Sequence, residues 1–186
     1  MKLSLPLILI FALCGCQANN FDGYTFYDPL EPVAYAGPTP VYLRGTFDDV
    51  NLSALTDAEK AWNDMLPAPM FGDPHPLGDH KAICGEIIVE MKTVPRIGDV
   101  GLWEYKKCVQ YITVDPDSGE WREGVYMHEL GHAARLDHDV PDGPHPDWDT
   151  SIMREESTFD AGSLVIKPWH IQSILAHYYV GWSQNL

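Results

Sequence analysis

Residues 128–132 read His-Glu-Leu-Gly-His, which places two histidines four residues apart. This spacing restricts the secondary structure and the chemistry of the middle of the chain. Trp121, Val125, His128 and His132 follow one another at offsets of four, three and four, which is the spacing of one helical face. Residues four apart on a helix are turned by only about 40° and raised by about 6 Å, so both imidazoles can face one metal ion. The sequence therefore predicts a helix with two metal ligands on its core side.

Glu129, which lies between the two predicted ligands, is the predicted general base. Glu129 lies about 100° around the helix from His128, which keeps its carboxylate off the metal but within reach of a water bound there. Zinc with three protein ligands and one open position lowers the pKa of its water to near neutrality. A carboxylate can then take the proton as the water attacks a carbonyl, and can pass it to a leaving amine. A helix with two core histidines and no metal is the alternative.

A third ligand decides the class of the site. His138 lies six residues beyond His132. On a continuous helix it would sit about 9 Å further along the axis and would not converge on the same ion. The helix must therefore break between these two residues if all three histidines bind one metal.

This spacing resembles that of the metzincins, the clan that contains matrix metalloproteinases and astacins, whose zinc helix ends in a turn that brings in a third histidine. Ser151-Ile152-Met153 is similar to the methionine turn of that clan, and the resemblance covers residues 39–179. It implies zinc as the cofactor, a peptide or protein as the substrate and endopeptidase activity. It also implies an apolar floor under the ligands formed by Met153.

The fold class that the resemblance implies is α/β (α+β). We expect a mixed, twisted sheet of about four to five strands with an active-site helix, a methionine turn, a C-terminal helix and a cleft along the edge strand.

One residue departs from the metzincin pattern. Arg135 occupies the position of the clan's usual turn glycine. A residue with a side chain costs on the order of 1 kcal/mol when forced to positive φ. Either Arg135 accepts that strain, or the helix breaks at a neighbour such as Asp137.

Two other interpretations stay open. Glu156 begins a Glu-x-x-x-Asp spacing that thermolysin-like enzymes use for their third ligand, although residues 154–162 lack apolar helical periodicity. The chain would alternatively be a non-catalytic surface lipoprotein that keeps zinc for structure or binds a partner.

Periodicity around the motif predicts alternating strands and helices. We expect strands at residues 39–47, 83–91 and 109–114, with a further exposed strand at 98–107 and a loop at 71–80. Capping-box patterns at 56–59 and 117–120 predict the starts of two helices, the first of which stops at Pro67. A last helix is expected from about Ile171 to near Gly181.

The N-terminus predicts export. Residues 1–2 are followed by an apolar run, 3–13, that is too short to span a bilayer. The run ends in Cys14-Gly15-Cys16, which resembles a bacterial lipobox with lipid attached to Cys16; a plain signal peptide is the alternative. Gln17 after the cysteine favours the outer membrane or cell surface, with the membrane reached through the lipid only. The predicted organisation is a signal peptide at 1–15, a tether at 16–38 and a zinc metallopeptidase domain at 39–186.

The remaining cysteines, Cys84 and Cys108, are predicted to form a disulfide, since an exported chain meets an oxidising compartment. Buried free thiols are the alternative.

The formal net charge of −15 excludes nucleic acid as a partner, because phosphate binding needs clustered Lys and Arg. A monomer is expected. Calcium is a second candidate ion, with a solvated acidic loop as the alternative. The carboxylates concerned surround His138 in sequence: Asp137, Asp139, Asp142, Asp147 and Asp149.

Overall fold

The structure is a computed structural model, and it describes residues 37–94, 100–140, 143, 147–154 and 164–178. The predicted signal peptide, Cys16 and nearly all of the tether lie outside these residues, as do Glu156 and Asp142. Their assignments stay predictions. None of the helices within the described ranges has the length and apolar character needed to span a membrane.

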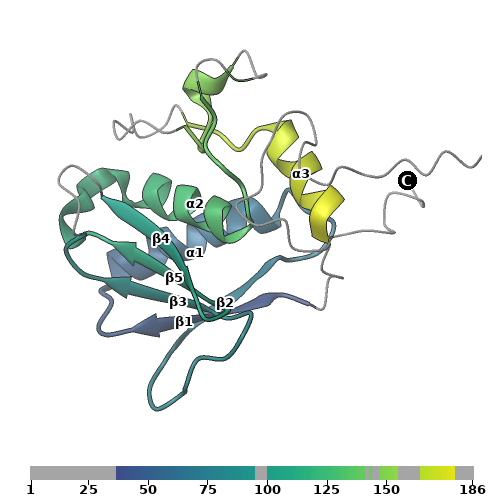
Figure 1. Cartoon of the computed structure of the whole chain (residues 1–186). Helices are drawn as coiled ribbons and strands as arrows, with labels where there is room; N and C mark the ends of the chain where they lie inside the picture. Colours follow the sequence, from purple (N-terminus) through teal and green to yellow (C-terminus); the bar gives the residue numbers. More distant parts are fainter. Residues whose placement is uncertain (1–36, 95–99, 141–142, 144–146, 155–163, 179–186) are drawn as a thin grey trace, which may run out of the picture.

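A five-stranded mixed sheet forms the framework (Figure 1). Its spatial order is β2-β1-β3-β5-β4, in which β4 pairs antiparallel to β5 and every other neighbouring pair is parallel. Strand β4 therefore occupies one edge and leaves its outer side unpaired within the sheet. The bounds are β1 (Thr39–Arg44), β2 (Phe71–Pro76), β3 (Ile87–Met91), β4 (Gly101–Lys106) and β5 (Val109–Val114).

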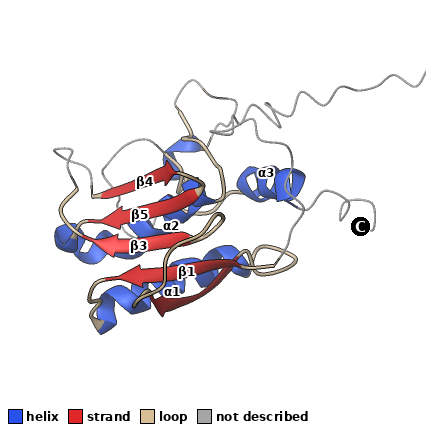
Figure 2. Cartoon of the chain, turned by 60° about the horizontal axis from the view of Figure 1, so that its bottom comes forward, coloured by secondary structure: helices blue, strands red, loops and turns tan. Residues whose placement is uncertain are grey.

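Two helices, α1 (Asp49–Asn63) and α2 (Arg122–Ala133), lie against the same face of the sheet (Figure 2). Trp62 of α1 is fully buried between them, and its Nε1 donates a hydrogen bond to the Met127 carbonyl of α2 at 2.9 Å. The core joins apolar side chains of both helices to those of β1, β3 and β5. This packing holds α2 firmly behind the edge strand.

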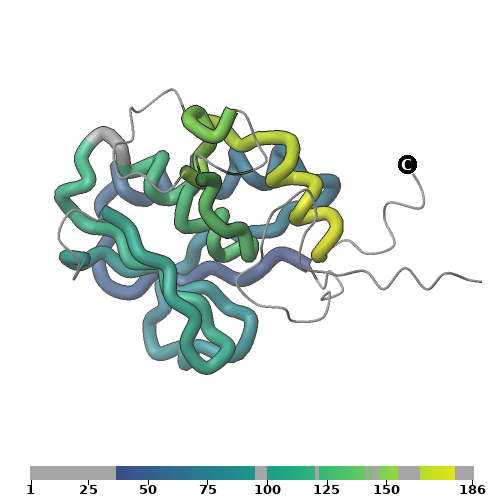
Figure 3. Tube along the Cα trace, turned by 45° about the horizontal axis from the view of Figure 1, so that its top comes forward, coloured from purple at the N-terminus to yellow at the C-terminus, as the bar shows by residue number. Residues whose placement is uncertain are grey.

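A third helix, α3 (Pro168–Tyr178), lies beside the segment that leaves α2 (Figure 3). Two short 3-10 helices, η1 (Pro116–Trp121) and η2 (Trp148–Thr150), complete the described elements. The predicted mixed α/β class with a sheet of four to five strands, an active-site helix and a C-terminal helix is confirmed.

The first helix begins earlier than the sequence pattern predicts. Asp48 is its N-cap, and its carboxylate accepts a hydrogen bond from the Asn51 backbone N–H at 2.8 Å. Thr56, predicted to start the helix, lies in its middle, where its hydroxyl donates to the Leu52 carbonyl. The prediction was wrong because an Asp eight residues upstream satisfies the free N–H groups equally well.

The second capping box is also displaced. Asp115 caps η1 by accepting from the Asp117 N–H at 2.9 Å, and α2 begins only at Arg122. Gly119, inside η1, has φ of 65° and interrupts this segment with a kink before α2 begins. The chain therefore enters α2 through a kinked turn.

The predicted loop at residues 71–80 contains strand β2. Its side chains show no apolar alternation, since the strand reads Phe-Gly-Asp-Pro-His-Pro. Backbone pairing with β1 defines it instead, together with the Asn63 side-chain amide, which donates to the Phe71 carbonyl and accepts from the Met70 and Phe71 N–H groups. An edge strand needs hydrogen bonds on one side only, so proline is tolerated there.

A disulfide joins Cys84 to Cys108, with a Cα–Cα distance of 4.7 Å. Cys84 comes shortly before β3, and Cys108 comes immediately before β5. Lys107 and Cys108 have φ of 52° and 64° and form the two-residue turn between β4 and β5. The bond therefore holds a turn that ordinary L-residues seldom adopt.

Candidate metal centre

The three predicted histidine ligands converge. The Nε2 atoms of His128 and His132 are 3.0 Å apart, and the Nε2 of His138 lies 3.1 Å from the first and 3.0 Å from the second. Within the described ranges, this is the only group of three or more His, Cys, Asp or Glu residues placed to share a metal ion. The structure thus brings together two residues of one helix and one residue of the loop that follows.

Backbone carbonyls orient the two helix histidines. The Nδ1 of His128 lies 2.7 Å from the Ile152 carbonyl oxygen, and the Nδ1 of His132 lies 2.9 Å from the Leu136 carbonyl oxygen. A carbonyl only accepts, so each Nδ1 carries the proton and each Nε2 keeps a lone pair. Such outer contacts fix the tautomer of metal-binding histidines.

The turn between the second and third ligands runs through Arg135, which has φ of 70°. The Arg135 N–H donates to the His132 carbonyl at 2.9 Å, and the Leu136 N–H donates to the Gly131 carbonyl at 3.0 Å. These two bonds form a Schellman motif, in which a left-handed residue ends the helix. Arg135 therefore accepts the conformation usually given to glycine, and the chain reverses soon enough to return His138 to the site.

The donor set fits zinc. Three nitrogens that bind one tetrahedral zinc ion at 2.0–2.1 Å lie about 3.4 Å apart, so the observed triangle needs to open by only a few tenths of an ångström. Three imidazole nitrogens with an open fourth position are also a common zinc donor set. The structure therefore offers a place for the ion without rearrangement of the fold.

Burial keeps the helix histidines neutral. Desolvation, reinforced by the neighbouring imidazoles, places the pKa of His128 well below its ordinary value. Burial and the His138 imidazole lower the pKa of His132 to about 4. Neutral imidazole is the form that binds a metal, so protons compete weakly for these two nitrogens near neutral pH.

Glu129 is buried between α2 and the edge strand, with 5% of its surface exposed. Its carboxylate packs against Gly101 of β4, where a Cβ atom would lie 2.4 Å from Oε1. The missing side chain at Gly101 therefore makes the space that the carboxylate occupies. Sequence reasoning did not single out this glycine, and a glycine at the start of a strand gives no signal of its own.

The segment predicted to form a methionine turn lies directly under α2. Met153 is fully buried, and a Cβ atom added to Gly131 would lie 2.2 Å from its sulfur. The Ile152 carbonyl is the group that orients His128. Gly131 therefore lets this turn approach the helix closely, between the two ligands.

A buried polar network fastens the loop after His138. The carboxylate of Asp139 lies 3.0 Å from the Nε2 of His170 on α3, and the Ser151 hydroxyl lies 3.2 Å from the same nitrogen. The Lys167 N–H donates to the Nδ1 of His170, so the proton is on Nε2. The network ties together the third-ligand loop, the methionine turn and α3. Sequence spacing could not reveal these two contacts of His170, because the partners lie 19 and 31 residues away.

The calcium hypothesis stays a prediction. Asp139, one of its candidate ligands, is buried and bonded to His170.

The sequence matches no protein-family model and no curated protein. Among solved structures, the chain is similar to high choriolytic enzyme 1 (HCE-1), a hatching enzyme zinc-protease from the medaka fish Oryzias latipes. The alignment has a TM-score of 0.49 and 14% sequence identity, and it covers 78% of this chain and 94% of the other. The assignment of the site therefore depends on the geometry of this chain's own residues.

Proposed function

We propose that the chain is a zinc-dependent peptidase of metzincin type, with His128, His132 and His138 as ligands and Glu129 as general base. The observation that carries this proposal is the convergence of the third histidine on the other two, through a Schellman turn at Arg135. It favours the three-histidine set over the alternative with Glu156, which lies outside the described residues.

A zinc ion held by His128, His132 and His138 would supply a Lewis acid that polarises a carbonyl and lowers the pKa of water. Glu129 lies beside the ligands and takes the proton from the attacking water, then gives it to the leaving amine. The open edge of β4 offers backbone groups that an extended peptide can pair with, which would draw the scissile bond past Glu129.

We also propose that the enzyme acts after export, tethered by lipid at Cys16. The disulfide between Cys84 and Cys108 supports this, because such bonds persist in oxidising compartments.

The test of the mechanism is Glu129→Gln in the full chain, measured for zinc content and for cleavage of casein and of mixed peptides. We expect stoichiometric zinc and a fall in kcat/KM of about 10²–10⁴-fold, because the proton acceptor is lost while the ligands stay. Glu123→Gln, an exposed residue of the same helix, is the matched control and should cleave at the parent rate.

A Glu129→Gln protein that cleaved at the parent rate would overturn the proposed mechanism. Spectroscopy that identifies the ligands of the bound zinc gives a second test of the function. Four protein ligands and no water would favour the non-catalytic lipoprotein instead.

A further inference from the structure

A buried positive charge, with no carboxylate partner among the described residues, lies next to the candidate metal centre. The side chain of Arg135 is 9% exposed. Among the residues that the structure describes, no carboxylate lies within ion-pair distance of its guanidinium. Burial of an unpaired charge is costly, so interior cations are normally matched by an anion. The described part of the chain does not provide an anion for Arg135.

Aromatic residues hold the guanidinium in place. Its central carbon lies 4.2 Å from the ring centre of Tyr105 and 5.9 Å from that of Trp103, within cation–π range. Stacking on a ring face leaves the N–H donors at the edge of the guanidinium plane, five in all, for other partners. The cation is therefore fixed and oriented, and described residues use only part of its donor capacity.

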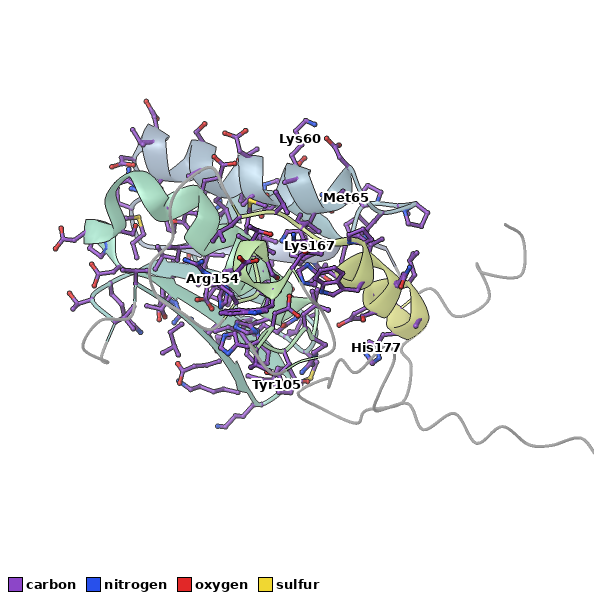
Figure 4. The ribbon with its side chains drawn as sticks, turned by 90° about the horizontal axis from the view of Figure 1, so that it is seen from above. Lys60, Met65, Tyr105, Arg154, Lys167 and His177 are labelled. Atoms are coloured by element: carbon purple, nitrogen blue, oxygen red, sulfur yellow. A yellow bond between two sulfur atoms is a disulfide. The ribbon has the colours of Figure 1, made fainter. Side chains whose placement is uncertain are left out.

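Tyr178 of α3 adds a neutral hydroxyl beside this cation. Burial raises the pKa of Tyr178 to about 12, and both the charge of Arg135 and a hydrogen bond from it act in the opposite direction. The hydroxyl thus accepts from Arg135 and keeps its own proton to donate. Figure 4 shows Tyr105 and His177, the neighbour of Tyr178, on the same side of the molecule.

The edge strand and the metal helix are matched in register. Gly101 faces Glu129, the Trp103 ring lies tilted beside that of His132 with ring centres 6.0 Å apart, and Tyr105 faces Arg135. Alternate residues of β4 thus meet the base, a ligand and the cation in turn. At about 3.3 Å per residue, Tyr105 lies about 7 Å beyond Trp103 and about 13 Å beyond Gly101.

We propose that Arg135, with Tyr105 and Tyr178, binds a carboxylate of the peptide substrate two to four residues from the scissile bond. The carboxylate belongs to an acidic side chain or to the free end of the peptide, and both present the planar acceptor that a guanidinium recognises. The inference rests on the proposed peptidase function and adds a substrate class to it. It also accounts for an arginine at a turn position where glycine would be unstrained.

The test uses internally quenched octapeptides of alanine with one Glu or one Gln at each position on either side of the central bond. Each is made with a free and with an amidated C-terminus, which separates the two sources of carboxylate. In the parent, the best carboxylate peptide should exceed its neutral counterpart in kcat/KM by about tenfold or more. In Arg135→Asn the ratio should fall to within about twofold. Asparagine tolerates positive φ, so the turn is kept.

Lys106→Gln removes an exposed cation at the end of the same strand and is the matched control, which should keep the parent's preference. A preference that persists in Arg135→Asn, or a parent with no preference, overturns the proposal. A second variant, Arg135→Gly, keeps the turn and also removes the cation. Circular dichroism and zinc content of Arg135→Asn and Arg135→Gly establish that the turn has survived.

Failure of the peptidase proposal can be distinguished from failure of the carboxylate-site proposal. If the parent cleaves none of the peptides, calorimetric binding of the same Glu and Gln peptides still decides the matter. Tighter binding of the carboxylate form that depends on Arg135 upholds the carboxylate site while the peptidase proposal falls. Equal binding of both forms overturns the carboxylate site.

Discussion

At the scale of single residues, two glycines shape the site by leaving space. Gly131 admits the sulfur of Met153 under the helix, and Gly101 admits the carboxylate of Glu129 behind the edge strand. Substitution Gly101→Ala would place a methyl group 2.4 Å from Oε1 of Glu129 and 2.7 Å from Val125. We expect zinc to stay bound and kcat/KM to fall by about 10²-fold, since a shift of about 1 Å in a catalytic group has that effect.

Peptide cleavage and metal analysis of the purified variant check this expectation. The control is Gly72→Ala in β2, where the new methyl group makes only ordinary contacts, the nearest at 3.4 Å. Parental kcat/KM in Gly101→Ala would show that the Glu129 carboxylate does not need its present position.

At the scale of elements, α1 buries an acid on its inner face, beside apolar residues of the core. Glu59 is 4% exposed, and burial, together with the charge of Asp73, raises its pKa to about 8 from an ordinary value of 4.5. Between these two values the folded chain keeps a proton that the unfolded chain releases. The free energy of unfolding should therefore fall as pH rises through this window.

Replacement of Glu59 by Gln should remove that loss. We expect Glu59→Gln to match the parent near pH 4.5 and to exceed it in unfolding free energy at pH 8 by on the order of 2–4 kcal/mol. Urea unfolding at the two pH values measures the difference. Asp57→Asn on the exposed side of α1 is the control and should show no such pH dependence. A stability difference that is constant with pH would contradict a protonated Glu59.

At the scale of the whole molecule, the disulfide connects the segment before β3 to the turn between β4 and β5. Strand β4 is the edge strand that borders the candidate site. The bond closes a loop with a sequence separation of 24 and contributes about 3 kcal/mol by the chain-entropy estimate. We expect the double variant Cys84→Ser with Cys108→Ser to lose about that much unfolding free energy and to keep its zinc, because the ligands lie on α2 and its following loop.

Denaturant unfolding with and without reductant checks this. Reductant should destabilise the parent and leave the double variant unchanged. Equal effects on both proteins would place the stabilisation elsewhere.

The local part of the site was readable from the sequence, because helix geometry alone sets the relation of His128, Glu129 and His132. The β-branched runs that became β3 and β5 were likewise recognisable, since buried strands need them. Strand β2 was predicted to be a loop, because backbone pairing and not side-chain alternation defines it. The starts of α1 and α2 were misplaced, because competing caps decide them.

The sequence by itself thus predicted a helix with two candidate ligands and a candidate base, and it identified His138, Met153 and Arg135 as the residues on which the proposed class depends. Only the tertiary structure decided that His138 returns to the other two, that Arg135 takes positive φ, and that β4 lies against α2. These outcomes depend on contacts between residues far apart in the chain, such as Gly101 with Glu129 and Asp139 with His170. Packing selects among the conformations that local propensity allows, so no local pattern could specify them.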